Sequence, residues 1–117
     1  MKKFFYLASC STCSRIMKEI GIENSDIELR EIKSAPITEK EMDEMVRLAG
    51  SAEALFSRVA LKYRALGLNG KQLTEKDYRK YILEEYTFLK RPVLVLDKKI
   101  YISNSKKNVE EMKKALG

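Results

Sequence analysis

The sequence predicts a single α/β domain over residues 1–117. A strand, a helix and a strand come first, a helical insertion follows over about residues 38–88, and two strands and a helix come last. Short apolar runs that favour strands occur near both ends of the chain, and helical patterns with capping signals fill the middle. The length of 117 residues is also that of one domain.

The first part of the chain is predicted to form a strand, a helix and a strand. Residues 2–7, KKFFYL, form a short apolar run typical of a buried strand. A helix follows the two cysteines and ends at Gly21. Its apolar residues fall on one face: Ile16, Met17 and Ile20. Residues 26–32, DIELREI, alternate in a way that favours a second strand, with Ile27 and Leu29 on the same side.

The middle of the chain is predicted to be helical. Thr38 and Glu41 form a capping-box pattern at the start of one amphipathic helix. Residues 52–67, AEALFSRVALKYRALG, are expected to form a further helix. Its buried residues would be Leu55, Phe56 and Val59. Thr74 and Asp77 mark the start of another helix.

The end of the chain returns to strands. Residues 91–97, RPVLVLD, and 99–103, KIYIS, are separated by a tight polar turn and predict an antiparallel hairpin. Pro92 can occupy only the first position of such a strand, where its missing N–H is tolerated. A last helix is expected over residues 106–116. The complete order is that of a thioredoxin-like fold, β-α-β then β-β-α, with a helical insertion between the two halves.

The composition limits the chemistry of the protein. The chain has no histidine, which excludes Cys/His zinc sites, serine-type triads and imidazole base catalysis. Two thiolates alone could hold zinc only with ligands from another chain, so we expect no metal site. We also expect no bound cofactor. The net charge of +6 is spread over lysine pairs and favours anionic substrates or acidic partners. No aromatic-rich strand motif or zinc-finger spacing accompanies it, so we expect no direct contact with nucleic acid.

The sequence also indicates a cytoplasmic protein. No apolar run approaches the length of a membrane span, and the start, MKKFFYLASCS, is too short and polar for the apolar region of a signal peptide. In that reducing compartment the two cysteines are not expected to form a permanent structural disulfide. We expect a monomer.

The two cysteines form a C-x-x-C motif between the first strand and the first helix. Cys10 just before the helix and Cys13 in its first turn would place their sulfurs within disulfide reach. Unpaired N–H groups and the positive end of the helix dipole would favour the Cys10 thiolate, with hydroxyls from Ser11 and Thr12 and the cation of Arg15 nearby. We predict that Cys10 is a nucleophile and Cys13 the resolving thiol. The alternative is that both are small buried side chains without a chemical role.

Three segments resemble the arsenate reductase (ArsC)/Spx family. They are CSTCSR at residues 10–15, ALFSRVALKYRALGL at 54–68 and FLKRPVLVLDKKIYIS at 88–103. The resemblance extends over essentially the whole chain. It implies a thioredoxin-like fold with a helical insertion, and Arg91 beside a cis Pro92 next to the nucleophilic cysteine. A planar, permanently charged guanidinium at this place suits an oxyanion or a carboxylate.

The reductase branch of the family implies an enzyme. There, one cysteine attacks arsenate, three arginines surround the oxyanion, glutathione is a co-substrate, and glutaredoxin or thioredoxin restores the thiol. Arg91 matches one of these arginines, Arg58 lies one place from the second, and residues 102–104 offer no third. The oxyanion or substrate site predicted in this way contains Ser11, Thr12, Arg15, Arg58 and Pro92 in addition to Cys10, Cys13 and Arg91.

The Spx branch implies a transcriptional regulator instead. Those proteins carry a C-x-x-C redox switch and bind the C-terminal domain of the RNA polymerase α subunit. Gly50 occupies a place similar to a glycine that those regulators use, and Arg58 matches the arginine of that branch. Gly50 is better explained as a simple helix break, because any helix break would show such a glycine. The sequence therefore leaves two hypotheses, a thiol-dependent reductase and a redox-sensing regulator.

Overall fold

The computed structural model describes all residues from 1 to 117, and the chain divides into two units. The first unit contains Met1–Ala35 and Arg91–Gly117, and the second contains Pro36–Lys90. The first unit thus brings together the two ends of the chain, and the second is formed by its helical middle.

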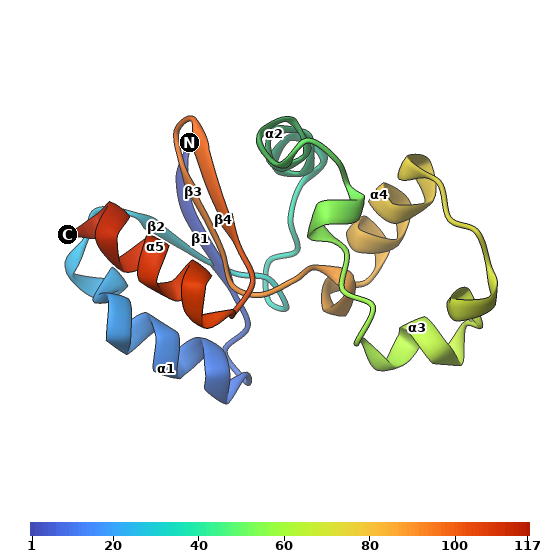
Figure 1. The fold of residues 1–117 in the computed structure, drawn as a ribbon, viewed down its shortest axis with the longest axis horizontal. Coiled ribbons are helices and arrows are strands. Elements are labelled where there is room, and N and C mark those ends of the chain that lie inside the picture. The colour runs from blue at the N-terminus through green and yellow to red at the C-terminus, as the bar shows by residue number, and fades with distance from the viewer. The chain divides into compact units, whose positions relative to one another are not determined.

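The strands of the first unit form a four-stranded mixed sheet in the order β2-β1-β3-β4 (Figure 1). Strand β1 (Lys2–Tyr6) lies parallel to β2 (Glu28–Glu31) and antiparallel to β3 (Val93–Leu96). A tight turn leads from β3 into the antiparallel β4 (Lys99–Ile102). The β-α-β and β-β-α order predicted from the sequence is confirmed.

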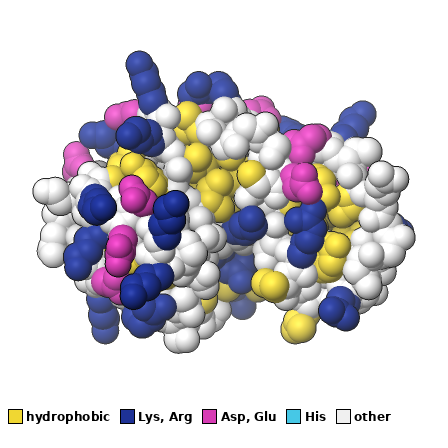
Figure 2. Space-filling model, viewed as in Figure 1, with side chains coloured by type: hydrophobic (Ala, Val, Ile, Leu, Met, Phe, Trp, Pro, Cys, Tyr) yellow, Lys and Arg dark blue, Asp and Glu magenta, His cyan; other side chains and the backbone are white.

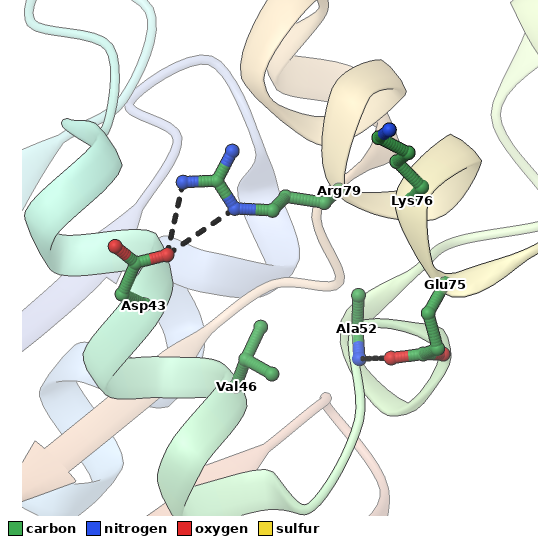
Figure 3. A pocket seen from close by; sticks show the side chains of 6 residues that line it. All are labelled: Asp43, Val46, Ala52, Glu75, Lys76 and Arg79. Carbon is green, nitrogen blue, oxygen red and sulfur yellow. Dashed lines mark hydrogen bonds and ion pairs between the residues drawn. The ribbon is translucent and has the colours of Figure 1, made fainter.

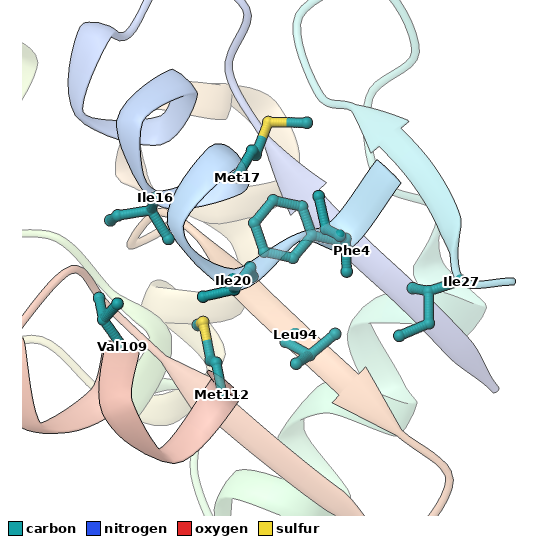
Figure 4. Close-up of a cluster of buried hydrophobic side chains, with 9 residues drawn as sticks. Phe4, Ile16, Met17, Ile20, Ile27, Leu94, Val109 and Met112 are labelled. Carbon is teal, nitrogen blue, oxygen red and sulfur yellow. The ribbon is translucent and has the colours of Figure 1, made fainter. Parts of the chain in front are cut away.

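Two helices pack on one face of this sheet. Helices α1 (Ser11–Ile20) and α5 (Lys106–Leu116) lie side by side (Figure 1). In the sheet register Phe4 lies opposite Leu94, and both side chains belong to the cluster under these helices (Figure 4). The members of the cluster are Phe4, Ile16, Met17, Ile20, Ile22, Ile27, Leu94, Val109 and Met112. Because the apolar face of α1 is buried in this way, the start of the helix has a fixed place above the end of β1.

The second unit contains helices α2 (Glu39–Ala49), α3 (Leu61–Ala65) and α4 (Glu75–Glu84). Short 3-10 turns occur in both units, at Ile22–Asn24, Glu53–Leu55, Leu68–Gly70 and Tyr86–Phe88. No helix of the chain combines the length and the apolar character that crossing a bilayer requires.

Helices α2 and α4 begin where their capping boxes predict. The Glu41 N–H donates to Thr38 Oγ1 at 3.0 Å, and the Thr38 N–H donates to the Glu41 carboxylate at 3.0 Å. The same reciprocal pair forms between Thr74 and Asp77 at the start of α4. Each box satisfies two backbone donors that have no partner within the helix.

Polar contacts connect these two helices and the loop that follows α2 (Figure 3). Arg79 of α4 reaches Asp43 of α2 at 2.9 Å. The Glu75 carboxylate accepts the Ala52 N–H at 2.6 Å. These groups line a hollow of about 240 Å³, and they satisfy one another across it.

The prediction of a helix over residues 52–67 is wrong for the middle of this segment. Phe56 pairs with Leu89 in an isolated antiparallel bridge, and the Ser57 N–H donates to the Phe88 carbonyl at 2.7 Å. The Phe56 N–H still closes the preceding 3-10 turn on the Glu53 carbonyl at 3.1 Å, but the backbone is extended from Phe56, and the next N–H, that of Ser57, bonds to the distant segment. The Phe56 ring then lies 5.0 Å from the Phe88 ring, whereas Val59, which was expected to be buried, is 91% exposed.

Candidate functional site

Cys10 occupies the position immediately before the first turn of α1. It is the N-cap residue of the helix and has extended backbone angles, φ −89° and ψ 111°. Its N–H donates to the Leu7 carbonyl at 3.1 Å, and its carbonyl accepts the Ser14 N–H at 3.2 Å. Leu7 is buried, so this turn connects the half-buried Cys10 directly to the end of the sheet.

The surroundings of Cys10 favour its thiolate. Partial burial raises the pKa of the thiol, but the N–H groups of Cys13 and Thr12, the Cys13 thiol and the charge of Arg91 together outweigh burial. The pKa of Cys10 therefore lies below its ordinary value of about 9. The Cys10 side chain makes no capping hydrogen bond. Its thiolate is instead favoured by the nearby N–H groups of Thr12 and Cys13 in the first turn of the helix.

Cys13 has the opposite character. Its side chain is 1% exposed. Burial raises the pKa of the Cys13 thiol to about 11, and the neighbouring Cys10, which accepts the Cys13 S–H, adds to the rise. At neutral pH the motif therefore holds one favoured nucleophile and one protonated thiol that donates to it.

Arg91 belongs to the same site. It directly precedes Pro92, and the Arg91-Pro92 peptide bond is cis. The positive charge of Arg91 lowers the pKa of both Cys10 and Cys13, and its Nε atom is buried. Pro92 is buried, and its carbonyl accepts the Ser103 N–H at 3.0 Å. The cis bond that the family resemblance implies is found at Arg91-Pro92.

The comparison with protein families decides the identity of the chain. The model of the ArsC family matches residues 5–112, which include both cysteines, Arg91 and Pro92. The chain belongs to the ArsC family. The family predicted from the three sequence segments is therefore confirmed, and the thioredoxin-like fold with it.

Individual relatives of this ArsC-family chain come from both branches. It is 26% identical over 118 residues to the global transcriptional regulator Spx 2 of Bacillus anthracis, covering 99% of this chain and 87% of that protein. A possible arsenate reductase of Streptococcus mutans UA159 superimposes with a TM-score of 0.69 at 29% identity, covering 86% of this chain and 87% of that one. The arsenate reductase of Vibrio cholerae gives a TM-score of 0.78 at 14% identity, covering 95% and 96%.

The other residues predicted around the cysteine differ in what they do. Thr12 favours the Cys10 thiolate through its backbone N–H, and Ser11 is exposed in the first turn of α1. Arg15 is exposed and lies 3.7 Å from Glu19, one helical turn further on. In the ArsC-family chain, the first turn of α1 thus acts on the sulfur mainly through its backbone.

Arg58 and Gly50 belong to the second unit. Arg58 Nη2 donates to Glu53 at 2.7 Å and to the Tyr78 hydroxyl at 2.9 Å, and the guanidinium lies 5.5 Å from the centre of the Tyr78 ring. Gly50 ends α2 with φ +93°, a conformation that favours glycine. Space would allow a Cβ there, so the backbone angle alone explains this residue.

One polar residue of the site was missed from the sequence. The Glu31 carboxylate accepts the Ala8 N–H at 2.8 Å, two residues before Cys10. Strand register was the signal that could have found it, because Glu31 and Tyr6 end two parallel strands side by side.

The acidic and thiol side chains of the chain form no cluster of metal ligands. No three or more His, Cys, Asp or Glu side chains lie close enough together to hold a metal ion. On the face drawn in Figure 2, Lys and Arg side chains are interspersed with Asp and Glu.

Proposed function

We propose that this chain is a cytoplasmic thiol-dependent reductase of the arsenate reductase type. The observation that supports this most strongly is the pair of thiols with opposite ionisation beside Arg91. Burial raises the pKa of Cys13 to about 11, whereas the pKa of Cys10 is lowered despite its partial burial. A nucleophile, a proton-bearing thiol and a cation are the groups that thiol attack on an oxyanion requires.

The reaction begins at the Cys10 sulfur. The thiolate attacks the arsenic(V) of arsenate and forms an S–As bond, while one arsenate oxygen takes up protons and leaves as water. Arg91 attracts the anion to the sulfur by charge. A second thiolate then attacks the Cys10 sulfur, the S–As bond breaks, and its electron pair stays on arsenic as arsenite. Two thiols are oxidised to a disulfide as arsenic(V) is reduced to arsenic(III).

Cys13 or glutathione provides the second thiol. Once Cys10 is bonded to arsenic, it is no longer a thiolate that accepts the Cys13 S–H, and one cause of the raised Cys13 pKa disappears. Burial of Cys13 remains and slows its attack, which favours glutathione as a competing co-substrate. Glutaredoxin or thioredoxin then restores the thiol. No bound cofactor is needed in this cycle.

A coupled assay tests this proposal. The reduced protein is mixed with arsenate, glutathione, glutaredoxin, glutathione reductase and NADPH, and NADPH consumption is followed. Native protein should turn over and Cys10→Ser should not, whereas Cys13→Ser should retain part of the rate if glutathione resolves the intermediate. Equal loss in both variants would show an obligate Cys10–Cys13 disulfide. No turnover by the native protein would contradict the reductase.

A redox-sensing regulator is the second candidate. It is favoured by the 26% identity to the Spx 2 regulator and by Arg58, which matches the arginine of the regulator branch and lies one place from the second arginine of the reductase branch. In the structure Arg58 pairs with Glu53. In this role, the Cys10–Cys13 disulfide would alter binding to the C-terminal domain of the RNA polymerase α subunit, with Gly50 in the contact region. Binding of that purified domain is measured before and after diamide oxidation, with Cys13→Ser as the control that cannot form the disulfide. Equal affinity in both states excludes the switch.

A further inference from the structure

We infer that Glu31 is a positioning residue that keeps Cys10 at the start of α1. The inference rests on the proposed role of Cys10 as the reactive thiol and adds a residue that no sequence motif marks. Its basis is the way in which the Glu31 carboxylate connects the two loops that follow the neighbouring strands β1 and β2.

The sheet register brings Glu31 to the cysteine loop. Glu31 ends β2, Tyr6 ends β1, and the two residues are partners in the parallel pairing. The Ile32 N–H donates to the Tyr6 carbonyl at 3.0 Å, which is the last backbone-to-backbone hydrogen bond between these segments. Because parallel strands end at the same edge of a sheet, a long side chain at residue 31 can reach the segment that follows β1.

Both oxygens of the Glu31 carboxylate are used. Oε2 accepts the Ala8 N–H at 2.8 Å, and Oε1 accepts the Ser34 N–H at 2.7 Å. These hydrogen bonds lower the pKa of Glu31, so the carboxylate is ionised at neutral pH. Hydrogen bonds to a charged acceptor are stronger than those between neutral groups. The side chain thus holds the loop before Cys10 and the turn after β2 at the same time.

The loop that Glu31 holds determines where Cys10 lies. The Cys10 N–H bonds to the Leu7 carbonyl at 3.1 Å, which makes Ala8 and Ser9 the central residues of a β-turn. Both are exposed, so packing does not fix the turn. The Ala8–Glu31 hydrogen bond therefore fixes the orientation of the turn, and with it the position of Cys10 relative to the N–H groups of Thr12 and Cys13. A freed turn would let the sulfur move away from those donors, and its pKa would rise.

Two effects of removing Glu31 have opposite signs, which makes the inference testable. Loss of a negative charge near a thiolate would lower the pKa of Cys10. Loss of the positioning bond would raise it, because the backbone N–H groups that favour the thiolate would act on it for less of the time. The sign of the change in the Cys10 pKa therefore distinguishes loss of the charge from loss of the positioning hydrogen bond.

The test measures the ionisation of Cys10 in the full reduced chain, without arsenate or an electron donor. The rate of Cys10 alkylation by iodoacetamide is followed by mass spectrometry from pH 5 to 9.5 in native protein, Glu31→Gln and Glu31→Ala. The pKa of Cys10 should rise by about half a unit to one unit, which lowers its thiolate fraction at pH 7 about three- to tenfold. The rise should be smaller in Glu31→Gln, whose amide keeps one acceptor oxygen. Glu28→Gln, an exposed glutamate of the same strand, should leave the pKa unchanged.

A lowered or unchanged Cys10 pKa in folded Glu31 variants would overturn the inference. Should the variants fail to fold, hydrogen exchange in the native protein decides the question. The Ala8 N–H should then exchange at least tenfold more slowly than the Ser9 N–H, although both residues are exposed. Equal exchange would overturn the inference in the same way. Neither the alkylation of Cys10 nor hydrogen exchange depends on arsenate turnover. Failure of the proposed reductase function is therefore distinguishable from failure of the inference about Glu31.

Discussion

At the scale of single residues, the two thiols of the candidate site respond differently to pH. Cys10 is half-buried beside backbone donors and Arg91, and Cys13 is buried beneath it. Alkylation of reduced protein should therefore modify Cys10 first, with half-maximal rate below pH 9. Cys13 should react only towards pH 11. Site-resolved mass spectrometry across this range checks the order, and simultaneous labelling of both thiols at pH 8 would contradict it.

Arg91 provides a second test at the same scale. Its charge favours the Cys10 thiolate, so Arg91→Ala should raise the pKa of Cys10, and Arg91→Lys should restore part of the difference. Arg15→Ala is the matched control, because that guanidinium lies by Glu19 on the exposed side of α1. The pKa is read from the pH dependence of alkylation. An unchanged Cys10 titration in Arg91→Ala would assign Arg91 to packing or to a partner contact.

The residues of the site were predictable from the sequence to different degrees. The ionisation of Cys10 follows from local geometry, because a residue just before a helix always faces its free N–H groups. The hydrogen bond of Arg58 to Tyr78 was not predictable, since these residues lie 20 positions apart and only the tertiary fold brings them together. Glu31 was missed for the same reason: its partner Ala8 lies 23 positions away along the chain.

At the scale of elements, helices begin at the residues where capping signals in the sequence predict them to begin. The capping boxes at Thr38 and Thr74 both form. The error over residues 52–67 arose because Phe56 and Ser57 bond to a segment about thirty positions later, and helical periodicity contains no information about such a partner. Hydrophobic spacing predicted that Leu55 and Phe56 are buried, but it could not predict the extended backbone that buries them.

The capping box of α2 gives a prediction for an element. Thr38→Ala removes the acceptor of the Glu41 N–H and frees the Glu41 side chain from its reciprocal bond. The free energy of unfolding should fall by about 1 kcal/mol, as is typical for the loss of an N-cap. Urea unfolding measures the change. Lys40→Ala, an exposed substitution in the same turn, should change it by less than about 0.5 kcal/mol. A Thr38→Ala variant as stable as the native protein would show that the box contributes nothing.

At the scale of the whole molecule, the fold is shared with proteins of very different sequence. The Vibrio cholerae arsenate reductase superimposes with a TM-score of 0.78 at only 14% identity. The strand order and the helix that begins at the cysteine are properties of backbone packing, which many apolar sequences satisfy. The fold alone therefore does not separate a reductase from a regulator, and the two hypotheses differ in the part they give to polar side chains such as Arg58, which pairs with Glu53.

The raised pKa of Cys13 has a consequence for the stability of the reduced chain. An unfolded thiol ionises near pH 9, whereas folded Cys13 keeps its proton up to about pH 11. Between these values the unfolded state binds fewer protons, so this contribution to the free energy of unfolding is complete below pH 9 and is lost as the pH rises towards 11. Cys10, whose pKa is lowered, has the opposite pH dependence: its contribution to the free energy of unfolding is complete above pH 9 and is lost as the pH falls below 9.

Comparison with a variant isolates the Cys13 contribution from the many other groups that titrate in alkali. Urea unfolding of reduced native protein and Cys13→Ser is measured at pH 8, 9, 10 and 10.5. The native protein should lose stability relative to Cys13→Ser as the pH rises above 9, because serine has no proton to lose in this range. A stability difference that stays constant from pH 8 to 10.5 would mean that Cys13 ionises as readily in the folded chain as in the unfolded one. The buried, protonated thiol on which the proposed order of attack depends would then be absent.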